Sequence, residues 1–321
     1  MPHLPLVVAA VRREAADVVA IDLAHPAGRP LPPFAAGAHV RVRAGEGPVR
    51  QYSLVNGPDD RWAYRIAVKL EPASRGGSAA MHRLVPGDTV LASLPVDGFP
   101  VDWSQGPLLL LAGGIGVTPL LGMARHAVAR GHPFQLHHFA RSAEAAAFAG
   151  ILDGPEFAGR ARAHFGLDPA AVPVRLAEIL AGAAAPGVHA YVCGPAAFMA
   201  AARAVGGPAL GAEALHFEYF TAAPGDGGGG GADREIAVHL AHSGRDLRVP
   251  AGRSILSVLQ EHGIAVDCSC LEGVCGMCVT EVLAGEPDHR DHFLSQPARA
   301  AGDVMTICVS RARGAALTLA L

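Results

Sequence analysis

Four cysteines near the C-terminal end constrain the fold of this chain more than any other feature. Cys270 and Cys275 have four residues between them, Cys275 and Cys278 have two, and Cys308 follows after twenty-nine more. Three thiolates on one tight loop, with a fourth from elsewhere in the chain, can surround one inorganic centre and complete its ligand set. The loop and the segment that carries Cys308 are therefore expected to meet in the folded protein.

This C-x4-C-x2-C…C spacing is the one used by plant-type [2Fe–2S] ferredoxins. Gly273 and Gly276 suit such a loop, because a residue without Cβ can take a positive φ and bring backbone N–H groups close to the sulfurs. Cys268 is left over, since using it in place of Cys270 would put six residues before Cys275 and break the pattern. We therefore predict a [2Fe–2S] cluster with the ligands Cys270, Cys275, Cys278 and Cys308.

Two other uses of these cysteines remain as alternatives. A structural zinc site also takes four thiolates, but usually as two short C-x2–4-C pairs, whereas here three cysteines share one loop. A disulfide framework is disfavoured further, because six cysteines in 321 residues are sparse and five of them lie in the last fifth of the chain.

The residues around the cysteines resemble a known family. The ferredoxin domain of the phthalate dioxygenase reductase and vanillate demethylase reductase family is similar to two segments, CLEGVCGMCVTEVLAGEPDHRDHFLS and CVSRARG. Members usually carry an acidic or polar residue where Leu271 stands, a departure that removes no ligand but touches the cluster loop. His289–Asp291 matches the kinase HRD triplet without the other kinase motifs, so we expect a solvated turn rather than a kinase or metal site.

Length, charge and hydropathy bound the rest of the chain. We expect two or three domains from 321 residues, and half of the residues are hydrophobic, which is ample for packed cores. A net charge of −3 gives no electrostatic reason to bind nucleic acid or an anionic membrane. Met1–Ala10 lacks the basic start of a signal peptide, so we expect a cytoplasmic protein with reduced thiols. Glycines and a proline interrupt the apolar run Leu108–Ala124, which favours a strand, loop and helix start over a membrane span.

Residues 1–102 predict a small antiparallel β-barrel. Short candidate strands are separated by Gly-Pro, Pro-Gly and Asp-Gly pairs, a pattern typical of such barrels. The expected strands are Val7–Val11, Val18–Leu23, His39–Val42, Gln51–Leu54, Tyr64–Lys69 and Thr89–Ser93.

Two motifs of this barrel have the chemistry to bind a phosphate and a flat ring. RQYSL, at Arg50–Leu54, offers a cation and hydroxyls, although an ordinary edge strand is the simpler explanation. In SRGGSAAMH, Gly76 and Gly77 precede a helix start expected at Ser78, where free N–H groups can cradle a phosphate. The alternative is a plain helix with Ser78 as its N-cap.

At this separation, and with Ala67–Lys69 between them, the two motifs resemble the flavin barrel of the same reductase family. The resemblance implies that Arg50 and Ser78 meet the phosphate region, while Tyr52 and Ser53 lie along the isoalloxazine and ribityl chain. The Gly-Gly-Ser form resembles the members that bind the mononucleotide, which implies FMN rather than FAD. The implied FMN-binding residues are Arg50, Gln51, Tyr52, Ser53, Ala67, Val68, Lys69, Gly76, Gly77 and Ser78.

Residues 103–223 alternate between strands and helices, which predicts an α/β domain with a parallel sheet. We expect strands at Leu108–Ala112, His132–Phe139 and His189–Cys193, and helices at Leu120–Arg130 and Ala143–Gly150. Ligands of such sheets bind beyond the carboxyl ends of the strands. GGIGVTP stands at one such end, although it lacks the G-x-G-x-x-G spacing of the dinucleotide fingerprint.

The pyridine-nucleotide domain of ferredoxin–NADP reductase-like proteins is similar in the order and spacing of three motifs, GGIGVTP, ARSAEAAAF and YVCGP. The resemblance implies that Thr118 borders the nucleotide and flavin, that Arg141 lies near the adenosine ribose, and that Cys193 faces the nicotinamide. A buried apolar thiol is the alternative for Cys193. The implied nucleotide-binding residues are Gly113, Gly114, Gly116, Thr118, Arg141, Cys193 and Gly194.

The remaining segments complete a three-domain plan. The family places an aromatic residue against the flavin ring where Phe220 stands, with a core phenylalanine as the alternative. Residues 224–234, which include PGDGGGGGAD, predict a Gly-rich flexible linker. Residues 235–321 predict an α+β plant-type ferredoxin domain with strands Ile236–Leu240, Leu247–Val249 and Val279–Leu283 and a helix over Ser254–His262 capped by Ser254.

The resemblance covers nearly the whole chain and implies the reductase component of a Rieske-type aromatic oxygenase or demethylase. Electrons would pass from NADH through FMN to the [2Fe–2S] cluster and on to the oxygenase component, with no protein residue needed as general acid or nucleophile. Arg141 is the one residue that favours NADPH, because an arginine near the ribose can accept a 2′-phosphate. Two alternatives stay open, a reductase for another acceptor such as a haem monooxygenase or a ferric chelate, and a non-catalytic redox-sensing or binding module.

Overall fold

The computed structural model describes residues 3–72, 76–183, 185–220 and 234–321. The chain divides into two compact units, Met1–Glu218 and Tyr219–Leu321. The predicted Gly-rich linker at 224–234 lies outside the described residues, except for Arg234. Within the described ranges, no helix is both long and apolar enough to cross a membrane.

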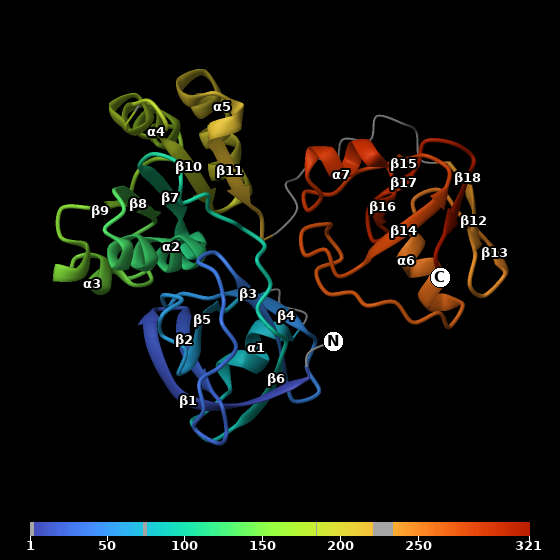
Figure 1. Ribbon diagram of the computed structural model, residues 1–321, viewed down its shortest axis with the longest axis horizontal. Helices are drawn as coiled ribbons and strands as arrows, with labels where there is room; N and C mark the ends of the chain where they lie inside the picture. The colour runs from blue at the N-terminus through green and yellow to red at the C-terminus, as the bar shows by residue number, and fades with distance from the viewer. Residues whose placement is uncertain (1–2, 73–75, 184, 221–233) are drawn as a thin grey trace. The chain divides into compact units, whose positions relative to one another are not determined.

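The first unit begins with six antiparallel strands, as the turn-punctuated sequence predicts (Figure 1). They hydrogen-bond in the order β4-β3-β6-β1-β2-β5, and a bridge between Leu54 and Ile66 joins the end of β4 to β5, which closes the sheet into a barrel. Leu6, Ile21 and Tyr64 are among the side chains that fill the interior. The elements are β1 (Leu4–Ala15), β2 (Val18–Ala24), β3 (His39–Ala44), β4 (Arg50–Ser53), β5 (Ala63–Lys69), the short helix α1 (Gly77–His82) and β6 (Thr89–Ala92).

A five-stranded parallel sheet, ordered β11-β10-β7-β8-β9, completes this unit. The chain moves outward from β7 to β9 and then returns to β10 on the other side of β7. Because crossovers are right-handed, this reversal puts α2 on one face and α4 with α5 on the other (Figure 1). The elements are β7 (Leu108–Gly113), α2 (Val117–Arg130), β8 (Phe134–Ala140), α3 (Ala149–Leu152), β9 (Ala161–Phe165), α4 (Ala171–Ala183), β10 (His189–Cys193), α5 (Ala196–Leu210) and β11 (Leu215–Glu218).

One predicted helix of this sheet domain is wrong, and four of its elements, β9, α4, α5 and β11, have no counterpart in the sequence prediction. Only Ala149–Leu152 is helical where Ala143–Gly150 was expected, and Phe148 precedes it with a positive φ of 64°. The elements β9, α4 and α5 are not predicted because their segments lack a clear apolar period. Pro208 even lies inside α5.

One apolar core runs from the barrel to the parallel sheet. It joins barrel side chains such as Val18 and Val55 to Leu110 of β7 and Leu120 of α2. Gly122 lets α2 approach the barrel closely, because a Cβ there would lie 2.6 Å from the carbonyl oxygen of Leu54. The two sheets of the first unit therefore share a core rather than folding as separate bodies.

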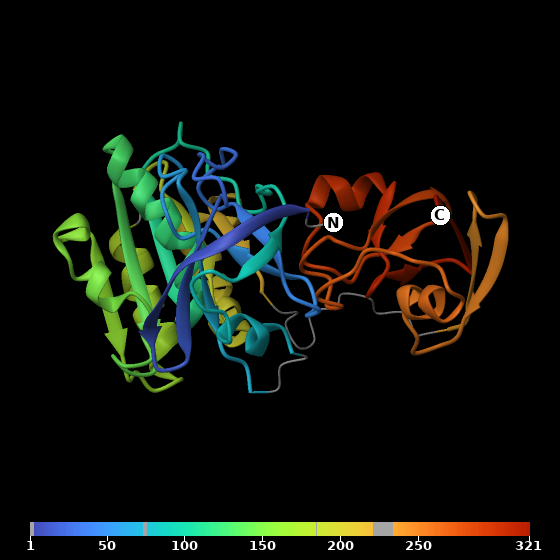
Figure 2. The same cartoon turned by 90° about the horizontal axis from the view of Figure 1, so that it is seen from below.

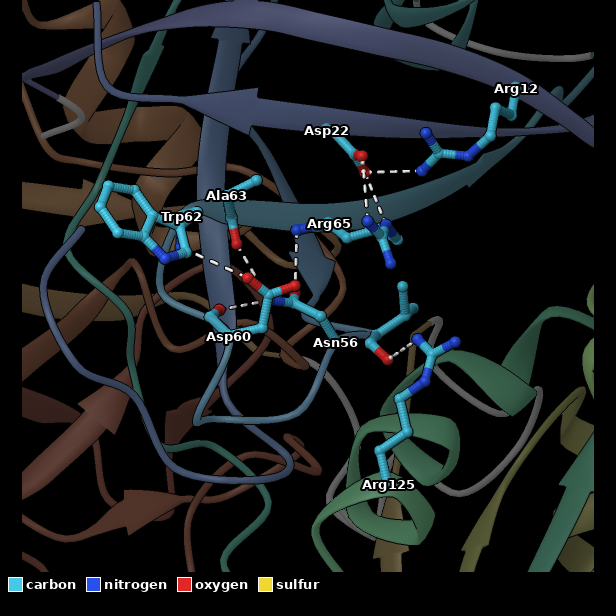
Figure 3. Close-up of polar contacts among 9 residues, drawn as sticks. Arg12, Asp22, Asn56, Asp60, Trp62, Ala63, Arg65 and Arg125 are labelled. Carbon is cyan, nitrogen blue, oxygen red and sulfur yellow. Dashed lines mark hydrogen bonds and ion pairs between the residues drawn. The ribbon is translucent and has the colours of Figure 1, made fainter. Parts of the chain in front are cut away.

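Polar contacts fix the same junction (Figure 3). Arg125 of α2 donates a hydrogen bond to the carbonyl oxygen of Val55 at 2.7 Å. The side chain of Asn56 donates to the carbonyl oxygen of Asp60 at 2.8 Å and accepts from the backbone N–H of Arg65 at 2.9 Å. The loop between β4 and β5 is thus held by its own side chains and attached to α2.

Asp22 of β2 extends this network across the barrel surface (Figure 3). Arg65 donates two hydrogen bonds to its carboxylate at 2.6 and 3.0 Å, and Arg12 donates a third at 2.8 Å. Burial alone would raise the pKa of Asp22, but the hydrogen bonds from Arg65 and Arg12 hold it below its usual value. Asp22 therefore stays charged and joins strands β1, β2 and β5.

The second unit is a mixed five-stranded sheet, ordered β13-β12-β18-β14-β16, with a separate two-stranded pair β15-β17 (Figure 1, Figure 2). As predicted, Ser254 caps α6, and its hydroxyl oxygen accepts from the backbone N–H of Ser257 at 3.0 Å. This helix and the sheet bury their own apolar core. The elements are β12 (Ile236–Leu240), β13 (Arg245–Val249), α6 (Ile255–Glu261), β14 (Val279–Ala284), β15 (Pro287–Asp288), α7 (Gln296–Ala301), β16 (Val304–Thr306), β17 (Arg311–Ala312) and β18 (Ala316–Leu319).

Candidate functional site

The loop between α6 and β14 carries three of the predicted cluster ligands, and two of its glycines are required by its shape. Gly273 has a φ of 72°, and a Cβ on it would lie 2.6 Å from Cγ2 of Val309. Gly276 has a φ of 68°, and a Cβ on it would lie 2.2 Å from the ring of Phe293. No L-amino acid with a side chain fits either position without moving its neighbours.

The thiols of the four predicted ligands contact one another in pairs. Cys270 hydrogen-bonds to Cys275 and Cys308, and Cys278 hydrogen-bonds to Cys308. Hydrogen bonds from the thiols of Cys275 and Cys308 hold the pKa of Cys270 far below its ordinary value. Within the described ranges, no three His, Cys, Asp or Glu side chains meet as a closed site for a metal ion.

The donor set fits a [2Fe–2S] cluster, because such a cluster takes two protein ligands on each of its two irons. Cys270 with Cys275, and Cys278 with Cys308, supply two such pairs. Cys268 makes a different contact, since its sulfur accepts a hydrogen bond from the side-chain amide of Gln260 at 3.4 Å. The leftover cysteine therefore has a different hydrogen-bond partner from the predicted ligands.

The segment that follows β15 packs directly against the cluster loop, and the expectation of a solvated turn there is wrong. The side chain of Asp291 is fully buried, and its Oδ2 accepts backbone N–H bonds from Phe293 at 3.1 Å and Leu294 at 2.7 Å. The backbone N–H of His292 donates to the carbonyl oxygen of Gly273 at 2.9 Å. This turn therefore packs against the loop that carries the cysteines and stabilises it.

In the first unit, β4 and the start of α1 meet through Arg50 and Gly77. A Cβ on Gly77 would lie 2.8 Å from Cγ of Arg50, so the arginine side chain lies across the first turn of the helix. Gly76 precedes the helix with a φ of 91°, a conformation that favours glycine. The side-chain carbonyl oxygen of Gln51 is buried and has no hydrogen-bond partner in the part of the chain that the structure describes. These features fit a group that brings its own phosphate and polar atoms to the barrel.

Ser78 does not cap this helix, which corrects the alternative drawn from the sequence. The helix starts one residue earlier than expected, at Gly77, and the hydroxyl oxygen of Ser78 accepts from the backbone N–H of Glu71 at 3.1 Å. His82, at the other end of α1, contacts the carbonyl oxygen of Val68 through Nε2 at 2.9 Å. The predicted residues of β4, β5 and α1 therefore come together around one part of the barrel, with Tyr52 half-buried among them, where burial raises the pKa of its hydroxyl.

A second candidate binding site lies at the carboxyl ends of β7 and β10, where glycines line both loops. A Cβ on Gly116 would lie 2.2 Å from the carbonyl oxygen of Cys193, and a Cβ on Gly194 would lie 2.9 Å from Cα of Gly113. The two loops therefore pass each other with no room for side chains. This is the point at which the strand order reverses, where sheets of this class bind nucleotides.

The other predicted nucleotide residues have distinct surroundings. Thr118 is buried in the first turn of α2, and its hydroxyl donates to the carbonyl oxygen of Ile115 at 3.0 Å. His138, which the sequence analysis missed, is buried on β8 and contacts the carbonyl oxygen of Gly114 through Nε2 at 3.0 Å. Arg141 follows β8 with an exposed side chain. The glycine loop after β7 is thus supported from both α2 and β8.

Cys193 and Glu218 are paired across β10 and β11 at this same end of the sheet. The thiol of Cys193 is fully buried, and burial raises its pKa well above the ordinary value. Burial also raises the pKa of Glu218 to about 8, and its Oε2 has no hydrogen-bond partner among the described residues. Sequence analysis missed Glu218, although it is the one charged residue in HFEYF. Phe220 comes two residues later, is 36% exposed, and belongs to the second unit.

Comparison with known proteins gives three findings that agree with one another. A family profile described as "2Fe-2S iron-sulfur cluster binding domain" matches residues 238–313. The vanillate O-demethylase oxidoreductase of Pseudomonas sp. (strain HR199 / DSM 7063) is 42% identical over 99% of this chain and 100% of its own length. A solved structure of phthalate dioxygenase reductase, described as modular for electron transfer from pyridine nucleotides to [2Fe–2S], is 37% identical with a TM-score of 0.72, over 99% of this chain and 98% of that one.

A further solved structure differs in size from this chain. An intact type IV self-sufficient cytochrome P450 monooxygenase is 33% identical, with a TM-score of 0.85, over 99% of this chain but only 41% of that protein. The same arrangement of elements therefore also occurs as one part of a longer polypeptide.

Proposed function

The chain belongs to the family of phthalate dioxygenase reductases and vanillate O-demethylase reductases, and on that premise we propose that it takes electrons from NADH through FMN for the oxygenase component of a Rieske-type aromatic oxygenase or demethylase. It is an NAD(P)H-dependent oxidoreductase with a flavin and a [2Fe–2S] cluster. The observation that carries the proposal is the pairing of four thiols behind the C-x4-C-x2-C…C spacing, in the same chain as the glycine-lined strand reversal.

When bound, the flavin supplies hydride acceptance and one-electron release, and the cluster supplies one-electron storage. The residues of the chain bind and orient these groups. Arg50, whose side chain can lie over the start of α1 because Gly77 has no Cβ, would meet the phosphate of FMN with the residues of β4 and β5. Gly116 and Gly194 have no side chain, so the loops after β7 and β10 approach each other closely. This would leave room for the nicotinamide to lie against Cys193. Phe220 would cover the flavin ring.

The domain boundaries follow from the same proposal. Residues 1–102 would form the FMN barrel, 103–223 the nucleotide domain, 224–234 the linker and 235–321 the ferredoxin domain. The two compact units divide at Glu218, five residues before the proposed end of the nucleotide domain. The separate apolar core of the second unit supports the last of these as a body of its own.

The test for the cofactors is the content and spectrum of the purified protein. We expect acid treatment to release close to one FMN per chain, and the visible spectrum to carry flavin bands over the brown absorption of ferric sulfide. Release of FAD would contradict the mononucleotide assignment. Zinc in place of iron would leave the cysteine loop colourless and favour a binding module over a reductase.

The test for the electron donor is reduction by the two nicotinamide nucleotides. We expect kcat/KM to be higher for NADH. A preference for NADPH would reverse this assignment and would point to Arg141, an exposed residue after β8, as the group that accepts the 2′-phosphate. Reduction of both flavin and cluster by NADH, followed by oxidation when a Rieske oxygenase component is added, is the expected outcome.

A second candidate is a reductase for a haem monooxygenase. The observation that favours it is the match of this chain to part of a self-sufficient cytochrome P450. Adding a P450 domain or a Rieske oxygenase component to the NADH-reduced protein separates the two. Oxidation of the cluster only by the haem protein would replace the first proposal with the second.

A further inference from the structure

His138 of β8 is buried next to the glycine loop that follows β7 and contacts this loop through one ring nitrogen. In the parallel register of the two strands, His138 lies beside Ala112, two residues before Gly114. Its Nε2 lies 3.0 Å from the carbonyl oxygen of Gly114. Because a carbonyl oxygen can only accept a hydrogen bond, Nε2 carries the proton of the neutral ring and Nδ1 is the unprotonated nitrogen.

Packing alone does not explain a histidine at this position. The residue is fully buried, and burial holds the pKa of its ring below the ordinary value, so the ring is neutral. Nδ1 has no hydrogen-bond partner among the described residues. An apolar side chain of similar size would fill the same space without leaving a buried nitrogen unpaired. The hydrogen bond to Gly114 is therefore what the histidine contributes.

Gly114 is the least confined of the three glycines in this loop. Its φ is 53°, in the left-handed region, and nothing lies within 4 Å of the place where a Cβ would be. Glycine has the widest choice of backbone angles, so the peptide that joins Gly114 to Ile115 can rotate unless a contact holds it. Two donors hold its carbonyl oxygen, the backbone N–H of Val117 and Nε2 of His138.

The orientation of this carbonyl group decides where the next backbone N–H points. In a planar trans peptide, the C=O and the following N–H point in opposite directions. The short 3-10 turn Gly114–Gly116 leads directly into α2, and the first N–H groups of a helix have no partner within it. With the Gly114 carbonyl held by β8 and by Val117, the N–H of Ile115 points out of the start of the helix. The pyrophosphate of a nucleotide can accept a hydrogen bond from it there.

We propose that His138 is a positioning residue for the pyridine nucleotide, because it fixes the Gly114–Ile115 peptide so that the loop offers its N–H groups to the pyrophosphate before the nucleotide binds. This inference rests on the proposed function and adds to it a residue that lies outside the three nucleotide motifs. A loop that is ordered in advance loses less conformational entropy on binding. The hydrogen bond therefore raises the affinity for the nucleotide and not the rate of hydride transfer.

His138→Leu tests the proposal, since leucine fills the buried site without a hydrogen-bond donor. In calorimetric titration of the purified full chain, the dissociation constant for NAD+, which cannot reduce the flavin, should rise about 3- to 10-fold. With ferricyanide as acceptor, KM for NADH should rise by the same factor while kcat changes less than about twofold, because the bound nucleotide then holds the loop itself. Amide hydrogen exchange over Gly113–Thr118 should be faster in the nucleotide-free variant.

His138→Gln and His138→Asn separate the hydrogen bond from the packing of the ring. The side-chain amide of glutamine reaches as far as Nε2, so it can donate to the same carbonyl oxygen and should keep the dissociation constant within about twofold. Asparagine is shorter and reaches only to the position of Nδ1, so it should weaken binding as leucine does.

His132→Leu is the matched control. His132 also contacts a glycine carbonyl oxygen through Nε2, that of Gly106 at 3.1 Å, but this contact lies at the amino end of β7. The variant should leave the dissociation constant for NAD+ unchanged.

The outcomes distinguish this inference from the proposed function. Equal dissociation constants in the unchanged chain and in His138→Leu would overturn the inference alone, and so would equal losses of affinity in His138→Gln and His138→Leu. If His138→Leu does not fold, the comparison of His138→Asn with His138→Gln decides in its place. A chain that prefers NADP+ is titrated with that nucleotide, since both carry the same pyrophosphate. If the unchanged chain binds neither nucleotide, the proposed function fails, and the inference fails with it.

Discussion

Cys268 and Cys270 are two residues apart, yet they make different contacts. Cys270 meets two other thiols, whereas Cys268 accepts a hydrogen bond from Gln260 of α6. We therefore expect Cys268→Ser to keep the cluster and Cys270→Ser to lose most of it. Iron and acid-labile sulfide per chain, with the paramagnetic resonance signal after reduction, measure both.

The other ligands give the controls for this prediction. Cys275→Ser, Cys278→Ser and Cys308→Ser should behave like Cys270→Ser while still oxidising NADH with an artificial acceptor, because the flavin precedes the cluster in the electron path. A chain that keeps its cluster after Cys270→Ser and loses it after Cys268→Ser would show that the ligand set is wrong.

Glu218 makes the stability of the first unit depend on pH. Its pKa is raised by burial from 4.5 to about 8, so between these values the folded chain holds a proton that the unfolded chain has lost. Stability should therefore fall as pH rises from about 5 to about 8 and change little above that. Glu218→Gln should remove this slope, and its thermal midpoint at pH 8 should exceed that of the unchanged chain by roughly 5–10 °C.

Thermal unfolding of the flavin and nucleotide unit across this pH range is the measurement. Glu213 is an exposed carboxylate two residues before the start of β11, and Glu213→Gln should keep the slope of the unchanged chain. An unchanged slope in Glu218→Gln would mean that the buried carboxyl is already ionised at neutral pH.

These two residues also show what sequence can and cannot reveal at this scale. The cluster ligands are predictable because the spacing of three of them is local and is set by the size of one loop. Glu218 is not, because its burial depends on the register of β11 beside β10, which places it next to Cys193. The seven predicted nucleotide residues and ten predicted FMN residues stay predictions, although four glycines among them have close approaches that leave no room for a Cβ, namely Gly77, Gly113, Gly116 and Gly194.

The helix α1 is the element on which the FMN proposal depends most. A Cβ on Gly77 would displace the side chain of Arg50, which lies 2.8 Å from it at Cγ. Gly77→Ala should raise the dissociation constant for FMN about 10- to 100-fold, as expected for the loss of a charged hydrogen bond. Fluorescence titration of the flavin-free protein with FMN measures this constant.

Gly182→Ala is the control for this prediction. Gly182 lies in α4 with nothing within 4 Å of its would-be Cβ, so alanine there should favour the helix and leave FMN affinity unchanged. Equal FMN affinities in the unchanged chain and in Gly77→Ala would show that Arg50 does not bind the phosphate of FMN.

Helices and strands are predicted correctly where turn-forming or capping residues mark their ends. Gly-Pro, Pro-Gly and Asp-Gly pairs mark the barrel strands, and Ser254 marks the start of α6. It fails for α4 and α5, because alanine, glycine and proline obscure the apolar period that defines a helix. It also fails at Phe148, whose left-handed backbone starts α3 late and cannot be foreseen from residue type.

The chain divides into two units with separate cores, and the linker expected between them is a prediction from composition alone. The ten residues Pro224–Asp233 would reach roughly 18 Å on average, and five residues would reach about 12 Å. Deleting Gly227–Gly231 should therefore leave NADH-to-ferricyanide activity unchanged, because hydride transfer needs only the flavin and nucleotide domains. Electron transfer to the oxygenase component should fall severalfold.

Steady-state rates with the two acceptors are the measurement. Loss of both activities to the same extent would show that the segment is needed for the fold and not for the reach of the second unit. Replacing Gly227–Gly231 with five serines keeps the length and should restore the transfer.

At this scale the order of motifs predicts the three sheets, since each motif set belongs to one type of domain. The sharing of one core by the barrel and the parallel sheet is not predictable in the same way. It arises from Gly122 and Arg125, two residues of α2 that have no motif of their own and meet the barrel only in the folded chain.

That shared core has a consequence for the synthesis of the chain. Barrel side chains such as Val18 and Val55 are covered by α2 and the parallel sheet, and α2 ends only at Arg130. At 5–20 residues per second, the roughly one hundred residues between Val18 and α2 take about 5–20 s to translate. During that interval these apolar side chains lack the partners that α2 and the parallel sheet supply, whereas the second unit brings its whole core within about ninety residues. The yield of this reductase in a cell therefore depends on what protects its first strands until α2 has been made.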